Sequence, residues 1–434
     1  MSELNKDTFT ILNYQGSKKN LLSFINDNIK GYIDEKKAIL DICCGTASVA
    51  YSLKRNNIVY ANDSELYATV IAKALLQFNN DNGLWTKIEA DFCKLYKENY
   101  NELIKIFYSY YQSEEEAINL NDYKMIRELY DNFPSIWSEK SFKCFGNTIS
   151  TINDINKYKE SIPYMLFTTY YSTTYFGIKQ SMEIDSIRYA IEKIDNEDMR
   201  YMMLSSLYYA MKECVFSKDG HMAQPLDINT NFKKIFKVRN KSIYDAFKNK
   251  IIEFNKESFV VNKNENKVFN MEMMDIIKLD EIKNNVGFIY ADPPYTDMQY
   301  SRYYHLLNTV TLYDYDNISL NRGKLSKGLY REKRFQSPLS QRSKAKEQIE
   351  ALFKFCKDNK INLGFSFAYP RDPEKQAVNR YTMSIDAIID LAMVTFGIDN
   401  VQILTEEYEH SNNRNMDTKK VLEYLILCKS KELN

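Results

Sequence analysis

Short apolar runs that end in an acidic residue mark the first part of the chain. Residues 38–41 read Ala-Ile-Leu-Asp and lead through a turn at 42–48 into a helical pattern that ends near Leu53. Residues 58–63 form a second such run, which also ends in an acid and is followed by a helical stretch to Phe78. Two strand–turn–helix units of this length predict a parallel α/β topology.

Further strand-like runs appear after residue 265. The best of them, residues 286–291, reads Val-Gly-Phe-Ile-Tyr-Ala and continues directly into Asp-Pro-Pro-Tyr. The other runs lie at 267–269, 362–367, 401–404 and 421–428. Together with the two N-terminal runs, they predict one seven-stranded sheet in an α/β fold.

The region between the two sets of strands has a different character. It contains few strand-like runs and two long helical stretches, near 101–132 and near 184–216. We expect the second stretch to begin at Asp185 and Ser186, because both are good capping residues. The predicted segments are 1–95 (first part of the α/β domain), 96–265 (a mostly helical insertion) and 266–434 (second part of the α/β domain).

Composition narrows the class of protein. A length of 434 residues suits two or three domains, and 44% hydrophobic with 27% charged residues is typical of a globular chain. No apolar run approaches the ~18 residues of a membrane helix, and the first ten residues lack a secretory pattern. The seven cysteines show no Cys-x-x-Cys spacing, and the three histidines are too scattered to propose a metal site. These features predict a cytoplasmic protein with reduced thiols and without a metal.

Charge is balanced overall but uneven along the chain. Lys plus Arg and Asp plus Glu each total 58, so bulk charge does not indicate nucleic-acid binding. Residues 231–250, however, carry seven basic residues against Asp245, and residues 321–346 carry nine against Glu332. Such segments are typical of phosphate contacts, with a solvated charge run as the alternative. The candidate nucleic-acid contacts are Lys233, Lys234, Lys237, Arg331, Lys333 and Arg334.

The turn after the first strand-like run suits a nucleotide-like ligand. Residues 41–48 read Asp-Ile-Cys-Cys-Gly-Thr-Ala-Ser, and their small side chains let the backbone approach a ligand closely. Asp63, which ends the second run, can accept hydrogen bonds from ribose hydroxyls. A turn of small residues that serves packing alone is an equal alternative.

Asp292, Pro293, Pro294 and Tyr295 form a sharper signal. They follow the best predicted strand, at the carboxyl end where α/β proteins bind ligands. The prolines stiffen the turn, and they have no N–H to pair with nearby carbonyls. The turn can therefore present a carboxylate, a carbonyl and an aromatic face to one planar substrate. A turn that merely ends the strand is the alternative.

Three motifs resemble those of the alpha-class (Dam-type) DNA adenine methyltransferases. They are residues 13–18 (Asn-Tyr-Gln-Gly-Ser-Lys), residues 41–48 and residues 292–295. In that family a target-recognition insert separates the methyl-donor loop from the Asp-Pro-Pro-Tyr motif, and this chain has the same order. The resemblance covers 10–80 and 265–434. It implies a Rossmann-like class I methyltransferase fold with a seven-stranded mixed sheet and a mostly helical inserted target-recognition domain.

The resemblance also implies roles for individual residues. Asp292 to Tyr295 would hold the target adenine, and Lys18 would lie near the carboxylate of S-adenosylmethionine. The residues that would bind this cofactor are Tyr14, Gly16, Lys18, Asp41, Cys43, Gly45, Asp63 and Asp275. Glu272 is a rival to Asp275 for contact with the cofactor's adenine. The chain departs from the family at Cys43, where Phe is usual, and at Ser17 and Ala47, where Gly is frequent.

The implied function is transfer of a methyl group from S-adenosylmethionine to the 6-amino group of an adenine flipped out of duplex DNA. The setting would be restriction–modification, phage defence or an orphan enzyme. The partners would be double-stranded DNA and a cognate restriction endonuclease or other defence components, with no membrane. Methylation of RNA or of the 4-amino group of cytosine stays open, because the Asp-Pro-Pro-Tyr turn alone permits it. A non-catalytic DNA-binding module is the third reading.

Overall fold

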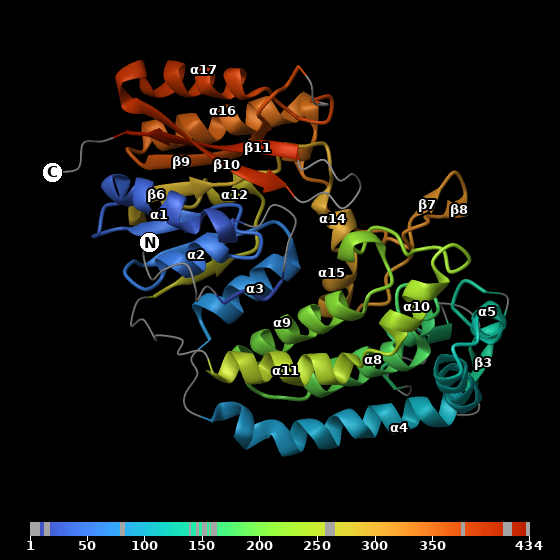
Figure 1. Ribbon diagram of the computed structural model, residues 1–434. Coiled ribbons are helices and arrows are strands. Elements are labelled where there is room, and N and C mark those ends of the chain that lie inside the picture. Colours follow the sequence, from blue (N-terminus) through green and yellow to red (C-terminus); the bar gives the residue numbers. More distant parts are fainter. Residues whose placement is uncertain are drawn as a thin grey trace. The chain divides into compact units, whose positions relative to one another are not determined.

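The structure is a computed structural model whose chain divides into two compact units (Figure 1). It describes residues 9–12, 18–78, 83–138, 140–144, 147–149, 154–155, 157, 163–256, 265–374, 378–410 and 419–430. Unit 1 comprises Met1–Gln77, Val260–Tyr300 and Phe335–Asn434, and unit 2 comprises Phe78–Phe259 and Ser301–Arg334. Unit 2 therefore holds most of the segment 96–265 and also a stretch that follows the Asp-Pro-Pro-Tyr motif.

Unit 1 is built on a seven-stranded sheet with the strand order β10-β11-β9-β6-β1-β2-β5. The strands are β1 Ala38–Asp41, β2 Val59–Asn62, β5 Lys267–Phe269, β6 Val286–Ala291, β9 Asn362–Pro370, β10 Val401–His410 and β11 Lys419–Cys428. β11 runs antiparallel to both of its neighbours, and the other pairs are parallel. The predicted α/β class with a mixed seven-stranded sheet is confirmed.

The strand order creates a ligand-binding crevice by topology. From β1 the sheet extends through β2 to β5 on one side, and from β6 it extends through β9 on the other. Because β1 and β6 are parallel neighbours, their carboxyl ends meet where the direction of winding reverses. The turn at 42–48 and the Asp-Pro-Pro-Tyr turn leave the sheet at these two ends, so the topology brings both motifs together.

Helices cover both faces of this sheet (Figure 1). α16 (Arg342–Asp358) and α17 (Ile385–Phe396) cover one face, over a core that includes Leu40, Ile289 and Phe365. The helices of the other face are α1 (Leu22–Ile29), α2 (Ser48–Leu53) and α3 (Leu66–Leu76). Two short helices, α12 (Met273–Ile276) and α13 (Asp280–Asn285), connect β5 to β6.

Unit 2 is mostly helical. Its longer helices are α4 (Leu84–Asn119), α5 (Tyr123–Asn132), α8 (Ile178–Glu192), α9 (Glu197–Cys214), α10 (Phe232–Arg239) and α11 (Ile243–Lys256). Its other elements include α7 (Leu166–Tyr170), most of α14 (Tyr300–Tyr303), α15 (His305–Leu312) and the hairpins β3–β4 (Phe142–Cys144, Asn147–Ile149) and β7–β8 (Leu320–Asn321, Lys324–Leu325). That this unit recognises target DNA stays a prediction.

The helical stretch predicted to begin at Asp185 is two helices, and the predicted start is wrong. α8 begins at Ile178, and Asp185 lies buried within it. Its carboxylate accepts hydrogen bonds from the N–H groups of Phe167 and Thr168, at 2.8 and 2.7 Å. Asp185 does satisfy helix N–H groups, but they belong to α7, a separate helix that precedes α8 in the chain.

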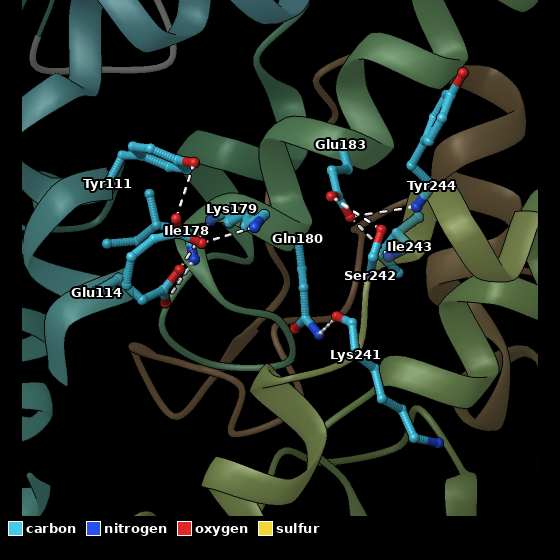
Figure 2. Close-up of polar contacts among 11 residues, drawn as sticks. Tyr111, Glu114, Ile178, Lys179, Gln180, Glu183, Lys241, Ser242, Ile243 and Tyr244 are labelled. Atoms are coloured by element: carbon cyan, nitrogen blue, oxygen red, sulfur yellow. Dashed lines mark hydrogen bonds and ion pairs between the residues drawn. The ribbon is translucent and has the colours of Figure 1, made fainter. Parts of the chain in front are cut away.

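Two buried glutamates of unit 2 serve the same purpose (Figure 2). Glu114 of α4 accepts hydrogen bonds from the first two N–H groups of α8, at 2.8 and 2.9 Å. Glu183 of α8 accepts hydrogen bonds from the first two N–H groups of α11, at 2.7 and 3.3 Å. These N–H groups have no partner within their own helix, and the helix dipole favours a negative charge beside them. The carboxylates therefore fasten neighbouring helices together.

We expect Glu183→Ala to destabilise unit 2 by ~2–4 kcal/mol, because buried donors at the start of α11 lose their acceptor. Glu183→Gln keeps an acceptor oxygen and should be nearly neutral. Thermal unfolding with both variants measures the difference. An unchanged melting temperature for Glu183→Ala would contradict the capping role.

The same residue gives unfolding a predictable dependence on pH. Burial raises the pKa of Glu183 from 4.5 to about 7, although its hydrogen bonds oppose the rise. The folded form then binds a proton more readily than the unfolded form, so this contribution is fully present below pH 4.5 and lost as the pH rises through about 7. Glu183→Gln should remove this part of the pH dependence.

Candidate active site

The carboxyl ends of β1, β2, β5 and β6 surround a pocket in unit 1 with about 990 Å³ of open space. Among the described residues, its charged lining side chains are Lys18, Asp41, Asp63, Glu65, Glu272 and Asp292. Because acidic groups outnumber basic ones, the pocket is suited to a cationic ligand.

The turn after β1 has a strained backbone. Gly45 and Ala47 both lie in the left-handed region, with φ of 51° and 54°. Glycine adopts this conformation readily, whereas another residue pays ~1–2 kcal/mol for it. This conformation explains why glycine is frequent at the position of Ala47 in the family that the motifs resemble. In this chain Ala47 adopts the same conformation at a cost in backbone strain.

Two aspartates hold this turn in place. Asp63 accepts hydrogen bonds from the Gly45 N–H and the Glu65 N–H, both at 2.9 Å, so it links the turns after β1 and β2. Asp41 Oδ2 accepts a hydrogen bond from the Ala50 N–H in α2 at 3.2 Å. The other oxygen, Asp41 Oδ1, is buried and has no hydrogen-bond partner within the described ranges. Asp41 is one of the residues that line the pocket.

Asn62 is a site residue that sequence reasoning missed. Its amide donates to the carbonyls of Ile42 and Met271, at 3.0 and 3.1 Å, and accepts from the Met271 N–H at 3.1 Å. It therefore joins the turns after β1 and β5. The available signal was a polar residue at the end of a buried strand, directly before Asp63.

Asp292 shares a buried lysine with a second acid. Lys18 Nζ lies 3.0 Å from Asp292 Oδ1 and 2.9 Å from Glu423 Oε1. The side chains of Lys18 and Glu423 are 4% and 0% exposed, and that of Asp292 is 20% exposed. Burial raises the pKa of Asp292 to about 7, Lys18 opposes the rise, and Glu423 adds to it. Sequence reasoning missed Glu423, although it is the only acid in the apolar run 421–428.

Tyr295 lines the pocket, and two other aromatic side chains pack against its ring. Its ring stacks on Tyr381 with centroids 5.9 Å apart and meets Phe367 edge-on at the same distance. Its carbonyl accepts a hydrogen bond from the Thr382 N–H at 3.1 Å. Pro293 and Pro294 also line the pocket. The whole Asp-Pro-Pro-Tyr turn therefore faces the ligand space.

The other predicted cofactor residues have different positions. Tyr14 and Gly16 lie outside the described residues. Cys43 is half-buried and lines the pocket. Asp275 lies on α12 with a side chain that is 58% exposed and paired with Lys278, whereas its rival Glu272 lines the pocket.

The predicted nucleic-acid contacts lie in unit 2, in two groups. Lys233, Lys234 and Lys237 are exposed on α10, where Lys234 also donates to the Ser217 carbonyl. In the second group, Lys333 is exposed, while Arg334 lies over the Tyr330 ring at 5.1 Å. Arg331 is buried and pairs with Asp314 at 2.7 Å and with Asp316 at 3.5 Å. The charge of Arg331 is therefore matched within unit 2.

A membrane-spanning helix must meet requirements of both length and apolar character. Among the residues that the structure describes, no helix combines the length and the apolar character that crossing a bilayer requires.

Comparison with known families gives one match over most of the chain. The family model described as D12 class N6 adenine-specific DNA methyltransferase matches residues 14–362. This range includes the turn after β1, the whole of unit 2 and the Asp-Pro-Pro-Tyr turn. It ends at the start of β9, so Glu423 lies beyond it.

The individual relatives share about a quarter or less of their aligned residues with this chain. Modification methylase LlaI of Lactococcus lactis subsp. lactis is 25% identical over 429 residues, which are 96% of this chain and 55% of the relative. The type II methyltransferase M.FokI of Planomicrobium okeanokoites is 24% identical over 330 residues, 74% of this chain and 41% of the relative. Modification methylase StsI of Streptococcus sanguinis is 22% identical over 405 residues, 89% of this chain and 48% of the relative. The chain spans about half the length of these relatives.

Proposed function

Because the chain belongs to the D12 class N6 adenine-specific DNA methyltransferase family, we propose that it methylates the 6-amino group of an adenine in duplex DNA, with S-adenosylmethionine as the donor. The observation that carries the proposal is the meeting of two motifs in one pocket. Asp292 to Tyr295 line the pocket that the turn after β1 also lines. A donor and a planar acceptor can therefore bind side by side.

The chemistry of the pocket fits S-adenosylmethionine. When bound, this cofactor supplies an electrophilic methyl group on a cationic sulfonium. The acidic lining suits a ligand with positive charge. Asp41 Oδ1, a buried acceptor without a hydrogen-bond partner in the described part of the chain, suits an ammonium donor. Asp63, already bonded to the turn by two N–H groups, is placed to accept from ribose hydroxyls. Glu272 can contact the adenine of the cofactor.

Asp292 and Pro293 would activate the target amine. The lone pair of the 6-amino nitrogen is delocalised into the adenine ring, so the amine is a poor nucleophile. Hydrogen bonds from the amine to the Asp292 carboxylate and the Pro293 carbonyl favour a tetrahedral nitrogen with an available lone pair. These acceptors stabilise positive charge that develops on the amine in the transition state. Transfer would leave the donor as a neutral thioether, and the methylated amine would release one proton to water.

The target base must leave the helical stack to reach this pocket. Flipping costs a few kcal/mol. Stacking on Tyr295 would return ~1–3 kcal/mol, and the contacts of Tyr295 with Tyr381 and Phe367 keep its ring in place. A rigid aromatic face loses little entropy when a base stacks on it.

The exposed lysines of α10 are the best candidates for contacts with DNA phosphates. We expect replacement of Lys233, Lys234 and Lys237 by alanine to weaken binding ~10-fold or more for every duplex sequence, because phosphate contacts carry no base information. The slope of log affinity against log salt concentration should become shallower by roughly two to three. Fluorescence anisotropy at several salt concentrations measures both effects.

A matched control is available on α4 of the same unit. Lys87, Lys94 and Lys97 are also exposed, but acidic residues lie close to them in the sequence, at 89, 91 and 98. Their replacement by alanine should leave the salt slope unchanged. Equal slopes for the two triple variants would place the DNA elsewhere.

Methylation of defined substrates tests the proposed function directly. The chain is incubated with radiolabelled S-adenosylmethionine and, in parallel, duplex DNA or RNA of mixed sequence. We expect label in duplex DNA and 6-methyladenine after its digestion. Label in RNA, or in 4-methylcytosine, would support the alternatives instead. No label in any substrate, together with retained DNA binding, would favour a non-catalytic module.

The biological setting follows from the names of the relatives. LlaI and StsI are modification methylases and M.FokI is a type II methyltransferase. We therefore place this chain in restriction–modification, with a cognate endonuclease as partner and the cytoplasm as its location. Sequencing methylated bases in DNA from cells that express it would identify the recognised site.

A further inference from the structure

A buried acid in β11 lies close to the Asp-Pro-Pro-Tyr turn. Glu423 is 0% exposed, and its Oε1 is 2.9 Å from Lys18 Nζ. The same nitrogen is 3.0 Å from Asp292 Oδ1. Asp292 and Glu423 therefore share the buried ammonium of Lys18, and all three residues belong to unit 1.

The sheet register explains how these groups meet. Glu423 pairs with Ala368 of β9, and β9 lies between β11 and β6, which leads into Asp292. Alternate residues of a strand point to the same face. Ser366 is on the same face as Ala368, and its hydroxyl accepts a hydrogen bond from the Tyr290 hydroxyl of β6 at 2.9 Å. Glu423 therefore lies on the same face of the sheet as Ser366 and Tyr290.

Packing alone does not explain an acid at this position. Leu425 and Leu427 lie two and four residues after Glu423 in β11, so their side chains point to the same face of the sheet, and both are 0% exposed. An apolar residue would suit such a position, because burying a carboxylate is costly unless it is paired. The partner is Lys18, which also lies beside Asp292.

We propose that Glu423 is a positioning residue of the catalytic centre, which acts through the Lys18 ammonium that it shares with Asp292. This inference rests on the proposed function, in which Asp292 accepts a hydrogen bond from the target amine. One ammonium balances one of two nearby carboxylates, so Glu423 competes with Asp292 for Lys18. Glu423 thereby sets the pH at which Asp292 is ionised and ready to accept the amine.

Charge interactions give the direction of the effect. Glu423 raises the pKa of Asp292 and Lys18 lowers it, in addition to the rise caused by burial. Within the described part of the chain, the other titratable groups that interact with Asp292 or Glu423 include Asp41, Cys43, Tyr290 and Tyr381. They are unchanged when Glu423 is replaced. Glu423→Gln therefore removes the carboxylate that competes with Asp292 for Lys18, and Asp292 should ionise at a lower pH.

The pH profile of kcat on duplex DNA tests this proposal. For Glu423→Gln, we expect the acidic limb to move to lower pH by about one pH unit. Lys18→Met should move the limb to higher pH, because two carboxylates then face each other without an ammonium. A purely structural Glu423 would change the melting temperature or the yield but leave the limb in place, and that result would overturn the proposal.

Glu406→Gln is the matched control. Glu406 pairs directly with Glu423 in the register of β10 and β11, but its side chain is exposed. The substitution removes the same formal charge from a solvated position, so the limb should stay in place. A shift as large as that of Glu423→Gln would attribute the effect to general charge and contradict the role of the shared ammonium.

A titration without substrate separates this proposal from the proposed function. Carbon-13 NMR of labelled aspartate carboxyls, with Asp292→Asn used to assign the signal, follows Asp292 directly. We expect Asp292 to titrate at lower pH in Glu423→Gln than in the wild type. If the glutamine variant does not fold, Glu423→Leu can replace it, because leucine also occupies neighbouring positions of β11. Asp292 should then titrate at lower pH in Glu423→Leu as well. If Asp292 titrates at the same pH in the variant and in the wild type, the inference is overturned even when the wild type methylates DNA. If the titration is shifted in the variant but the wild type does not methylate DNA, only the proposed function is defeated.

Discussion

Replacement of Asp292 by alanine should lower the rate of methyl transfer by ~10³-fold or more. A single preorganised group that stabilises transition-state charge is worth about 10²–10³ in rate, and here the target amine would also lose its charged acceptor. Cofactor binding should survive in part, because Asp63 and the turn after β1 are unchanged. Single-turnover transfer of a labelled methyl group measures the rate, and calorimetry measures cofactor binding.

The electrostatics of the site make this variant informative. Without Asp292, Lys18 still pairs with Glu423 at 2.9 Å, so the substitution leaves no unpaired buried ammonium. The variant should therefore fold. Asp292→Asn is the control of similar shape, which keeps one acceptor oxygen without the negative charge and should lie between wild type and alanine. A near-normal rate for Asp292→Ala would show that another group acts on the amine.

Asp63→Ala should raise the Kd for S-adenosylmethionine ~100-fold, about 2.7 kcal/mol. The ribose hydroxyls would lose a charged acceptor, worth ~1.5–3 kcal/mol. The N–H groups of Gly45 and Glu65 would lose the carboxylate that holds the turn, so part of the loss is a looser turn. Isothermal titration with the cofactor gives the affinity directly.

Asp63→Asn separates the two causes. It keeps one oxygen for a backbone N–H, so the turn should stay partly ordered while the charge is lost. An intermediate Kd is therefore expected. If Asp63→Ala binds the cofactor as tightly as the wild type, the ribose lies elsewhere in the pocket and the role of Asp63 is limited to the turn.

Only some features of the pocket could be predicted from short stretches of sequence. The positions of the seven strands and the two motif-bearing turns were predictable, because a strand's apolar pattern and a Pro-Pro turn depend on a few neighbouring residues. The ends of the last three strands were not, since β9 and β10 extend to Pro370 and His410 and β11 begins at Lys419. The choice between Asp275 and Glu272 was not. Both precede β6 by a similar distance in sequence, but α12 turns Asp275 toward solvent and leaves Glu272 at the pocket.

Charged residues were the least predictable from sequence. Asp185 and Glu183 satisfy N–H groups of helices other than their own, and Arg331 is buried between two aspartates within a segment that looked like a basic surface run. A charge count along the chain cannot distinguish an exposed lysine on α10 from a buried arginine. That distinction depends on which distant segment packs against the side chain.

Short stretches of apolar and turn-forming residues were enough to predict the α/β class, the seven strands and the turn that carries Asp292. Which charges meet depends instead on the folded chain. Lys18 and Glu423 are more than four hundred residues apart in the chain, yet the Lys18 ammonium lies within 3.0 Å of both Glu423 and Asp292. Burial makes an unpaired charge costly. The partners that remove this cost come from segments far apart in the chain, and no local stretch of sequence shows that they meet.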